Sequence, residues 1–184
     1  LVPCNDFSFY DQVLDMSLTV GAIPERFQPL RDQPSADWLT LYFAMARGYQ
    51  QNGLDLKAME MTKWFDTNYH YIVPEFTVDQ SFTLLSEKVF EEFEEAKQTL
   101  GNVAKPVLLG PVSYLLLGKE KGEDFHRLDL LDRLLPIYEQ ILTRLQSQGA
   151  TWIQFDEPTL ALDLTDDQRS AFAKTYLRLR SEFP

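Results

Sequence analysis

The chain has 184 residues, of which 45% are hydrophobic and 13% aromatic, so it can bury one ordinary core and is not a disordered chain. Its formal net charge of −11 argues against a nucleic-acid surface, because phosphate binding requires an excess of Lys and Arg on some face. A small anionic ligand is compatible with this charge, since it needs only a few local cations.

Cysteine and histidine are scarce. Cys4 is the single cysteine, and we expect it to be a free thiol near a chain end. With only His70 and His126 beside it, a Cys/His metal site cannot be assembled. The sequence shows neither an apolar run near the ~20 residues that cross a bilayer nor a signal peptide. We therefore expect no membrane partner and a cytoplasmic protein.

The first third of the chain predicts two helices. Helical spacing of apolar residues predicts them over residues 7–20, capped from Asn5-Asp6, and over 38–47, ended by Gly48. Three prolines predict a loop over residues 22–36. Gln51-Asn52-Gly53 indicates a turn, and residues 54–64 are expected to be a short helix or irregular.

The remaining segments alternate between strand and helix. Strands are predicted at residues 69–73, 81–84, 105–111 and 151–156, with a further stub at 1–3. Helices are predicted at 86–100, with Ser86 as cap, at 112–117, at 128–148 and at 166–183. Pro136 must kink its helix or mark a new start.

This alternation predicts an α/β fold with a mostly parallel sheet of four or five strands and flanking helices. A complete (β/α)₈ barrel takes ~250 residues, so 184 residues predict a partial TIM-type barrel. We expect residues 1–184 to be a piece of a longer chain.

Polar residues at the carboxyl ends of parallel strands usually line the ligand crevice. Glu75, the Gly110-Pro111 loop and the pair Asp156-Glu157 occupy such positions. The two adjacent carboxylates are compatible with general acid–base roles or a cation site. We favour a structural role in which Asp156 accepts backbone N–H bonds and holds the loop.

Residues 60–76 combine aromatics, an amide, a histidine, carboxylates and Lys63 in one short run. His70 in this run is interpreted as a core histidine rather than a ligand, and His126 as a surface residue. Lys63 is the sharpest candidate, because a lysine beside aromatic rings offers a point charge to a carboxylate or phosphate. An ordinary surface lysine fits the same pattern equally well.

Four segments, residues 45–48, 58–76, 105–119 and 152–162, resemble the cobalamin-independent methionine synthase family. The resemblance extends over essentially the whole chain, and the run at 61–76 is its most specific part. It implies two barrels, of which the C-terminal one binds homocysteine and a zinc ion. The resemblance further implies that the zinc binds the homocysteine sulfur as a thiolate, which attacks the methyl group on N5 of the folate. The N-terminal barrel is implied to help hold the polyglutamate tail.

Lys63 matches the family's folate-binding lysine in its Met-Thr-Lys-Trp-Phe motif, so the resemblance makes it the substrate-binding residue. The family's early Gly-Phe-Pro-Arg segment, with a second basic cluster, does not occur in the chain, nor does the zinc barrel. The chain is thus expected to be a fragment of the N-terminal barrel domain, with no catalytic residue or metal ligand and no activity alone.

The resemblance names as partners 5-methyltetrahydropteroyl-polyglutamate and, through the other barrel, homocysteine. Two alternatives remain: a purely structural barrel module, and a barrel like uroporphyrinogen decarboxylase, which the run at 61–76 disfavours. Contacts of Asn68, His70, Glu75 and Asp156 with a ligand stay open. An incomplete barrel exposes strand edges and apolar surface, so we expect self-association or marginal stability.

Overall fold

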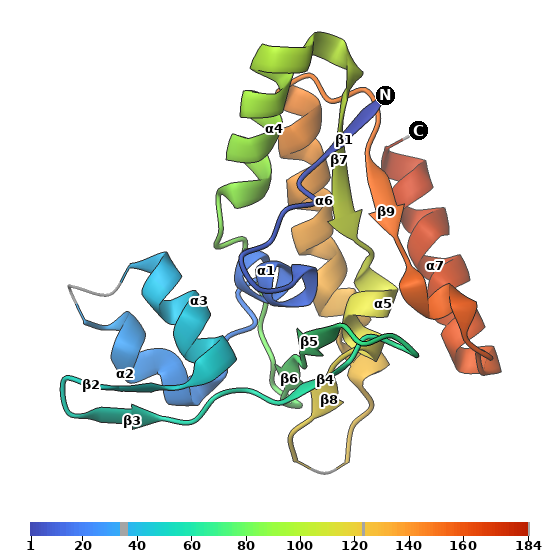
Figure 1. The fold of residues 1–184 in the computed structure, drawn as a ribbon. Helices are drawn as coiled ribbons and strands as arrows, with labels where there is room; N and C mark the ends of the chain where they lie inside the picture. Colours follow the sequence, from blue (N-terminus) through green and yellow to red (C-terminus); the bar gives the residue numbers. More distant parts are fainter. Residues whose placement is uncertain (34–36, 123, 184) are drawn as a thin grey trace.

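Three parallel strands and the long helices that flank them form the centre of the molecule (Figure 1). The computed structural model describes residues 1–33, 37–122 and 124–183. The strands lie in the order β1 (Val2–Cys4), β7 (Ala104–Leu109) and β9 (Gln154–Asp156). The flanking helices are α4 (Lys88–Leu100), α6 (Leu131–Ser147) and α7 (Asp166–Glu182).

The parallel register confirms the strands that the sequence predicted at these positions, including the stub at the start of the chain. Val2 pairs with Ala104, and Val107 with Gln154. Strand β7 is short, apolar and largely buried, as is typical of a strand in the middle of a parallel sheet. The 3₁₀ turn η2 (Gly101–Val103) joins α4 to it.

Of the two helices predicted in the N-terminal part, the first differs from prediction at its start. Helix α1 covers Gln12–Thr19 rather than 7–20, because the carboxylate of Asp11 accepts hydrogen bonds from the N–H groups of Val13 and Leu14, both at 2.8 Å. The cap thus lies at Asp11 and not at Asn5-Asp6. Helix α3 (Trp38–Arg47) is confirmed, and Gly48 ends it with φ of +82°.

The loop predicted over residues 22–36 is wrong in part. It contains the 3₁₀ turn η1 (Glu25–Phe27) and the short helix α2 (Gln28–Arg31), while residues 34–36 lie outside the described part of the chain. Pro29 sits in the first turn of α2, where a missing N–H costs nothing.

Two antiparallel hairpins follow α3. Strands β2 (Tyr49–Gln51) and β3 (Leu54–Leu56) flank the predicted turn, and β4 (Met61–Lys63) pairs with β5 (His70–Ile72). The prediction of a short helix or irregular chain over 54–64 is therefore wrong for both strands, and only residues 57–60 between them are irregular. The strand predicted at 69–73 exists as β5, but it pairs with β4 and stays outside the parallel sheet.

The strand predicted at 81–84 is also wrong. This extended segment binds the chain that follows α1, since the N–H groups of Thr83 and Leu85 donate to the carbonyls of Val20 and Thr19, both at 2.9 Å. A parallel pair instead joins β6 (Glu75–Phe76) to β8 (Lys119–Glu120). Five strands thus take part in parallel pairs, but they are divided between two sheets.

The remaining helical elements follow the strands. Helix α5 (Pro111–Leu116) comes directly after β7, and the 3₁₀ turn η4 (Pro158–Ala161) after β9. The turn η3 (Arg127–Leu130) leads into α6, which accommodates Pro136 within its length.

Two hydrophobic clusters hold the elements together. The larger packs β7 and α5 against α4 and α6 through residues such as Leu108, Val112 and Leu134. The second packs α1 against α3 and β5 through Leu14, Met45 and Ile72, all fully buried. The chain is therefore an α/β fold with a three-stranded parallel sheet and flanking helices, an arrangement that fits part of a barrel.

Candidate functional site

A pocket of about 380 Å³ lies on the carboxyl side of β7 and β9. Three segments line it: the β4–β5 hairpin, the end of α5 with the turn η3, and the stretch from η4 to the start of α7. Because α5 and η4 directly follow the parallel strands, this is the edge at which α/β proteins usually bind ligands. Its volume is within the usual range for small-molecule sites.

The register of the hairpin divides its side chains between two faces. Lys63 pairs with His70, and Thr62 with Tyr71. Since neighbours along a strand point to opposite faces, Lys63 and His70 share one face and Tyr71 lies on the other. Tyr71 is buried and donates a hydrogen bond to the Leu117 carbonyl at 2.9 Å, and this burial raises the pKa of its hydroxyl.

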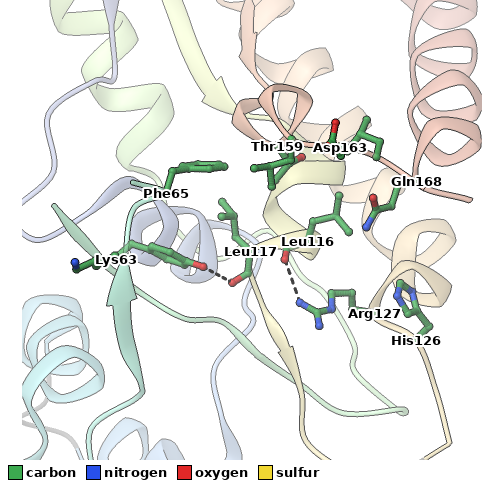
Figure 2. A pocket seen from close by; sticks show the side chains of 12 residues that line it. Lys63, Phe65, Leu116, Leu117, His126, Arg127, Thr159, Asp163 and Gln168 are labelled. Carbon is green, nitrogen blue, oxygen red and sulfur yellow. Dashed lines mark hydrogen bonds between the residues drawn. The ribbon is translucent and has the colours of Figure 1, made fainter. Parts of the chain in front are cut away.

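Lys63 lies at the rim of this pocket. Its side chain is exposed, and within the described residues it has neither an ion pair nor a hydrogen bond from its ammonium group. In Figure 2 the ammonium points away from the other labelled residues, whereas the ring of Phe65 extends toward Thr159. The cation is therefore available to a group outside the pocket mouth.

His70 is exposed, so its interpretation as a core histidine is wrong. The antiparallel pairing with Lys63 places it on the outer face of the hairpin, away from both clusters. Asn68 is likewise exposed at the hairpin tip, next to Tyr69, which is 79% exposed.

Arg127 lines the pocket but is fully engaged in structure. Its guanidinium binds both carboxylate oxygens of Glu120 at 2.8 Å. It also donates a hydrogen bond to the Leu116 carbonyl at 3.0 Å (Figure 2). Burial by itself raises the pKa of Glu120, yet the bonds from Arg127 outweigh it and hold the pKa at about 2. His126 is exposed, as predicted, and its Nδ1 accepts the N–H of Leu128 at the start of η3.

The structural carboxylate after β9 is Glu157 and not Asp156, which corrects the prediction. Glu157 is partly buried and accepts hydrogen bonds from the Ser113 N–H and from the Tyr176 hydroxyl, both at 2.7 Å. Burial raises its pKa, and these bonds partly oppose the rise. The side chain of Asp156 instead accepts the amide of Gln154 at 2.7 Å.

Gly110 makes room for Glu157. A Cβ on Gly110 would lie only 2.1 Å from the Glu157 carboxyl carbon. The loop after β9 is held a second time by the Ser113 and Thr159 hydroxyls, 2.7 Å apart and both buried. The close approach that the Gly110-Pro111 loop allows is therefore made by the side chain of Glu157.

Glu75 is paired as well. Arg26 binds its two oxygens at 2.6 and 2.9 Å, with the carboxylate side chain only 10% exposed. This bidentate pair satisfies the carboxylate within the protein. Of the residues that the sequence singled out, only Lys63 thus reaches the pocket with an uncommitted charge in the described part of the chain.

Sequence reasoning included Phe65 and Tyr71 in the run at 60–76 but missed Arg127 and Tyr176 as parts of this region. Phe65 has a φ of +52°, which is a left-handed conformation that no sequence pattern predicts for a phenylalanine. Arg127 binds Glu120 across a turn, and Tyr176 binds Glu157 from a different element of the chain. Only the folded structure shows these two contacts.

Two further findings concern the described residues alone. No three His, Cys, Asp or Glu side chains there come together as a metal site requires. Nor does any helix in these parts of the chain have the length and apolar character to span a bilayer.

Comparison with known proteins identifies the family. Residues 1–184 match the family described as "Cobalamin-independent synthase, N-terminal domain". Three relatives carry the name 5-methyltetrahydropteroyltriglutamate–homocysteine methyltransferase. The chain is 60% identical over 184 residues to the one from Cytophaga hutchinsonii, 62% over 184 to that of Flavobacterium johnsoniae and 57% over 179 to that of Xylella fastidiosa.

These alignments cover 100%, 100% and 97% of the chain but only 24%, 23% and 23% of the respective relatives. The chain therefore spans about a quarter of the length of the relatives it matches. The resemblance to the methionine synthase family is confirmed. By the match over its full length, the chain belongs to the cobalamin-independent synthase family, with the sequence of the N-terminal domain.

Proposed function

We propose that this chain is part of an enzyme that transfers a methyl group from 5-methyltetrahydropteroyl-polyglutamate to homocysteine to form methionine. The observation that carries the proposal is the identity of 57–62% over nearly the whole chain to relatives with that activity in their names. Within this enzyme, residues 1–184 belong to the N-terminal barrel domain, bind the polyglutamate tail and brace the catalytic barrel.

Lys63 is proposed as the residue that binds the tail. Its exposed ammonium lies at the rim of the pocket beside Phe65. There it can form a charge-assisted hydrogen bond with a carboxylate of a polyglutamate tail that extends out of the pocket. The outward direction of the ammonium supports contact with a tail rather than with a group held inside the pocket.

A purely structural role is the second candidate. It is favoured because the charged groups of Glu75, Arg127 and Glu157 are each bound by other groups of the protein. The two candidates differ only in whether Lys63 contributes to folate affinity.

Zinc is expected in the complete enzyme. The described residues hold no group of three suitable ligands, so they do not fit a zinc site, and we place zinc and the methyl-transfer chemistry outside this chain. The chain by itself is accordingly proposed to be inactive.

The test uses the full-length enzyme with Lys63→Ala. We expect the Kd for the triglutamyl folate to rise about tenfold, which corresponds to the loss of one charge-assisted contact, while the Kd for the monoglutamyl folate stays within about twofold. Lys57→Ala is the matched control, since Lys57 is an exposed lysine away from the pocket. An equal effect on both folates, or none, would remove the tail-binding role and favour the structural module.

A further inference from the structure

A groove of about 640 Å³ lies between α3 and the start of α4, on the side of the molecule away from α7 (Figure 1). Leu18 and Leu41 are buried beneath it. The rings of Phe9 and Trp38 also line it, and 53% and 54% of their surface is exposed. Large aromatic side chains that remain exposed together in a groove are typical of a surface that another segment covers.

The aromatic rings of this groove hold one another in place. Phe9 packs against Phe7, Trp38 and Phe43, with ring centroids 5.4, 6.2 and 6.4 Å apart. Trp38 is the first residue of α3, and it packs edge-on against the buried ring of Tyr42 at 6.2 Å. The apolar surface is therefore already formed, so a binding partner does not have to order it.

Helix α4 gives the groove an acidic wall. Among the described residues, five carboxylates but only two cations, Arg31 and Lys88, line it. Lys88 is paired with Glu92 at 2.9 Å, so its charge is satisfied within the protein. Glu91 and Glu95 lie one turn apart, are both exposed and have no ion pair in the described part of the chain. The charge of the groove therefore favours a partner with Lys or Arg.

The walls of the groove favour a helix as that partner. Within the described residues no strand contributes to the lining, so an extended segment would find no free strand edge to pair with. A helix satisfies its own backbone, and it can place an apolar stripe on the rings and basic residues opposite the glutamates. Helix α4 has 13 residues and is about 20 Å long, so about three to four turns of a second helix fit along it.

The sheet next to α4 indicates where this helix comes from. Helix α4 packs against β1 and β7, and in the described chain β1 has no partner on its other side. Where a barrel continues past an outer strand, the helix of the next unit lies beside the helix already present. The matched region is only 23–24% of each relative, so the remainder of the enzyme can supply such a unit. A second copy is disfavoured, because it brings the same acidic wall and the same net charge of −11.

We propose that this groove binds an amphipathic helix from outside residues 1–184 of the same enzyme. The apolar stripe of that helix covers Phe9 and Trp38, and its Lys or Arg residues pair with Glu91 and Glu95. The contact joins the α3 side of the chain to the rest of the barrel. It goes beyond the proposed function, since it depends on neither folate binding nor methyl transfer.

The experiment is hydroxyl-radical footprinting of the full-length enzyme, with oxidation of Trp38 and Phe9 measured by mass spectrometry. In the native enzyme we expect both rings to be oxidised at least about tenfold more slowly than in the same enzyme unfolded in urea, because the bound helix excludes water from them. This protection should be the same from about 0.1 to 10 μM enzyme, since a contact within one molecule does not depend on concentration.

Glu91→Lys combined with Glu95→Lys tests the charge pairing. The reversed charges repel the basic helix, so we expect the protection of Trp38 and Phe9 to fall by at least about fivefold. Side chains outside residues 1–184 that gain oxidation in this variant at helical spacing then locate the helix. Glu182→Lys is the matched control, because Glu182 is an exposed carboxylate of α7 that does not line the groove. Glu91→Gln with Glu95→Gln should cause a smaller loss of protection, and it serves if the reversed variant does not fold.

Three results would overturn the inference. Oxidation of the two rings at the same rate in the native and unfolded wild type would show an open groove. Protection that is unchanged in both glutamate variants would show that the covering segment is not a basic helix. Protection that increases with enzyme concentration would identify a second copy as the partner. Methyl transfer and the folate affinities of Lys63→Ala test the proposed function separately, so either proposal can fail without the other.

Discussion

The contact between Gly110 and Glu157 shows how the absence of one side chain makes room for a partly buried carboxylate. Glu157 lies between the first residues of α5 and the Tyr176 hydroxyl of α7, and it joins both to the loop after β9. Gly110 itself has an ordinary φ of −69°, so the reason for glycine is space and not backbone freedom.

We predict that Gly110→Ala lowers the free energy of unfolding by about 2–4 kcal/mol, because the new methyl displaces Glu157 and leaves the Ser113 N–H and Tyr176 hydroxyl unpaired. Chemical denaturation of the variant in urea measures this. In a double-mutant cycle with Glu157→Ala, the two losses should be clearly less than additive. Additive losses would show that Gly110 acts independently of Glu157.

The sequence located this region but chose the wrong carboxylate. The Asp156-Glu157 pair and the Gly110-Pro111 loop were both recognised as the ends of strands. Adjacent residues point to opposite sides, so one of the two carboxylates had to turn toward α5. Which one did so was decided by the register of β9 against β7, a pairing across 47 positions of sequence that no local pattern contains.

Among the elements, α1 and β5 are joined by a single carboxylate. Asp11 caps α1 through Val13 and Leu14, and its other oxygen accepts the Ile72 N–H of β5 at 2.9 Å. Burial raises the pKa of Asp11 from 3.8 to about 6, although these three backbone N–H groups work in the opposite direction.

This shift predicts a pH dependence of stability. Between pH 4 and 6 the folded state binds a proton at Asp11 that the unfolded chain has already released, so the unfolding free energy falls as pH rises. We expect the wild type to lose on the order of 2 kcal/mol over this interval relative to Asp11→Asn, which does not titrate. Urea denaturation of both proteins at several pH values measures the difference. A pH-independent difference would contradict the raised pKa.

Elements with strong local signals were predicted well. Helix α3 starts and ends where its apolar spacing and Gly48 indicate, and the structure adds the cap at Asp37. Strand β4 was missed because its residues Met61-Thr62-Lys63 carry no strand pattern, and only pairing with β5 makes them a strand. The segment at 81–84 was predicted as a strand but is not one, because its backbone forms hydrogen bonds with the end of α1 instead of with a neighbouring strand.

At the scale of the whole molecule, the parallel sheet has two outer strands. Within the described residues β1 and β9 each pair on one side only, with β7 between them. Large apolar side chains are exposed nearby, including Trp152 just before β9 at 63%. Unpaired strand edges beside apolar surface favour pairing with another chain.

We therefore predict that residues 1–184 self-associate in solution. Sedimentation velocity from about 1 to 100 μM should show a rising average mass. Trp152→Glu, which adds a charge beside the β9 edge, should weaken the association, whereas Leu177→Glu on the outer face of α7, where Leu177 is 69% exposed, should not. A compact monomer that melts cooperatively at every concentration would contradict this prediction.

The sequence by itself determined the α/β class, the family and the positions of most helices and of the three central strands, because these depend on local periodicity, caps and a long specific run at 61–76. Only the tertiary structure decided which polar groups are committed to the fold: it paired Glu75 with Arg26, turned Glu157 inward and left Lys63 uncommitted at the rim among the described residues. The physical reason is that burial and long-range partners, not residue type, determine whether a charged side chain is satisfied within the protein or remains for a ligand.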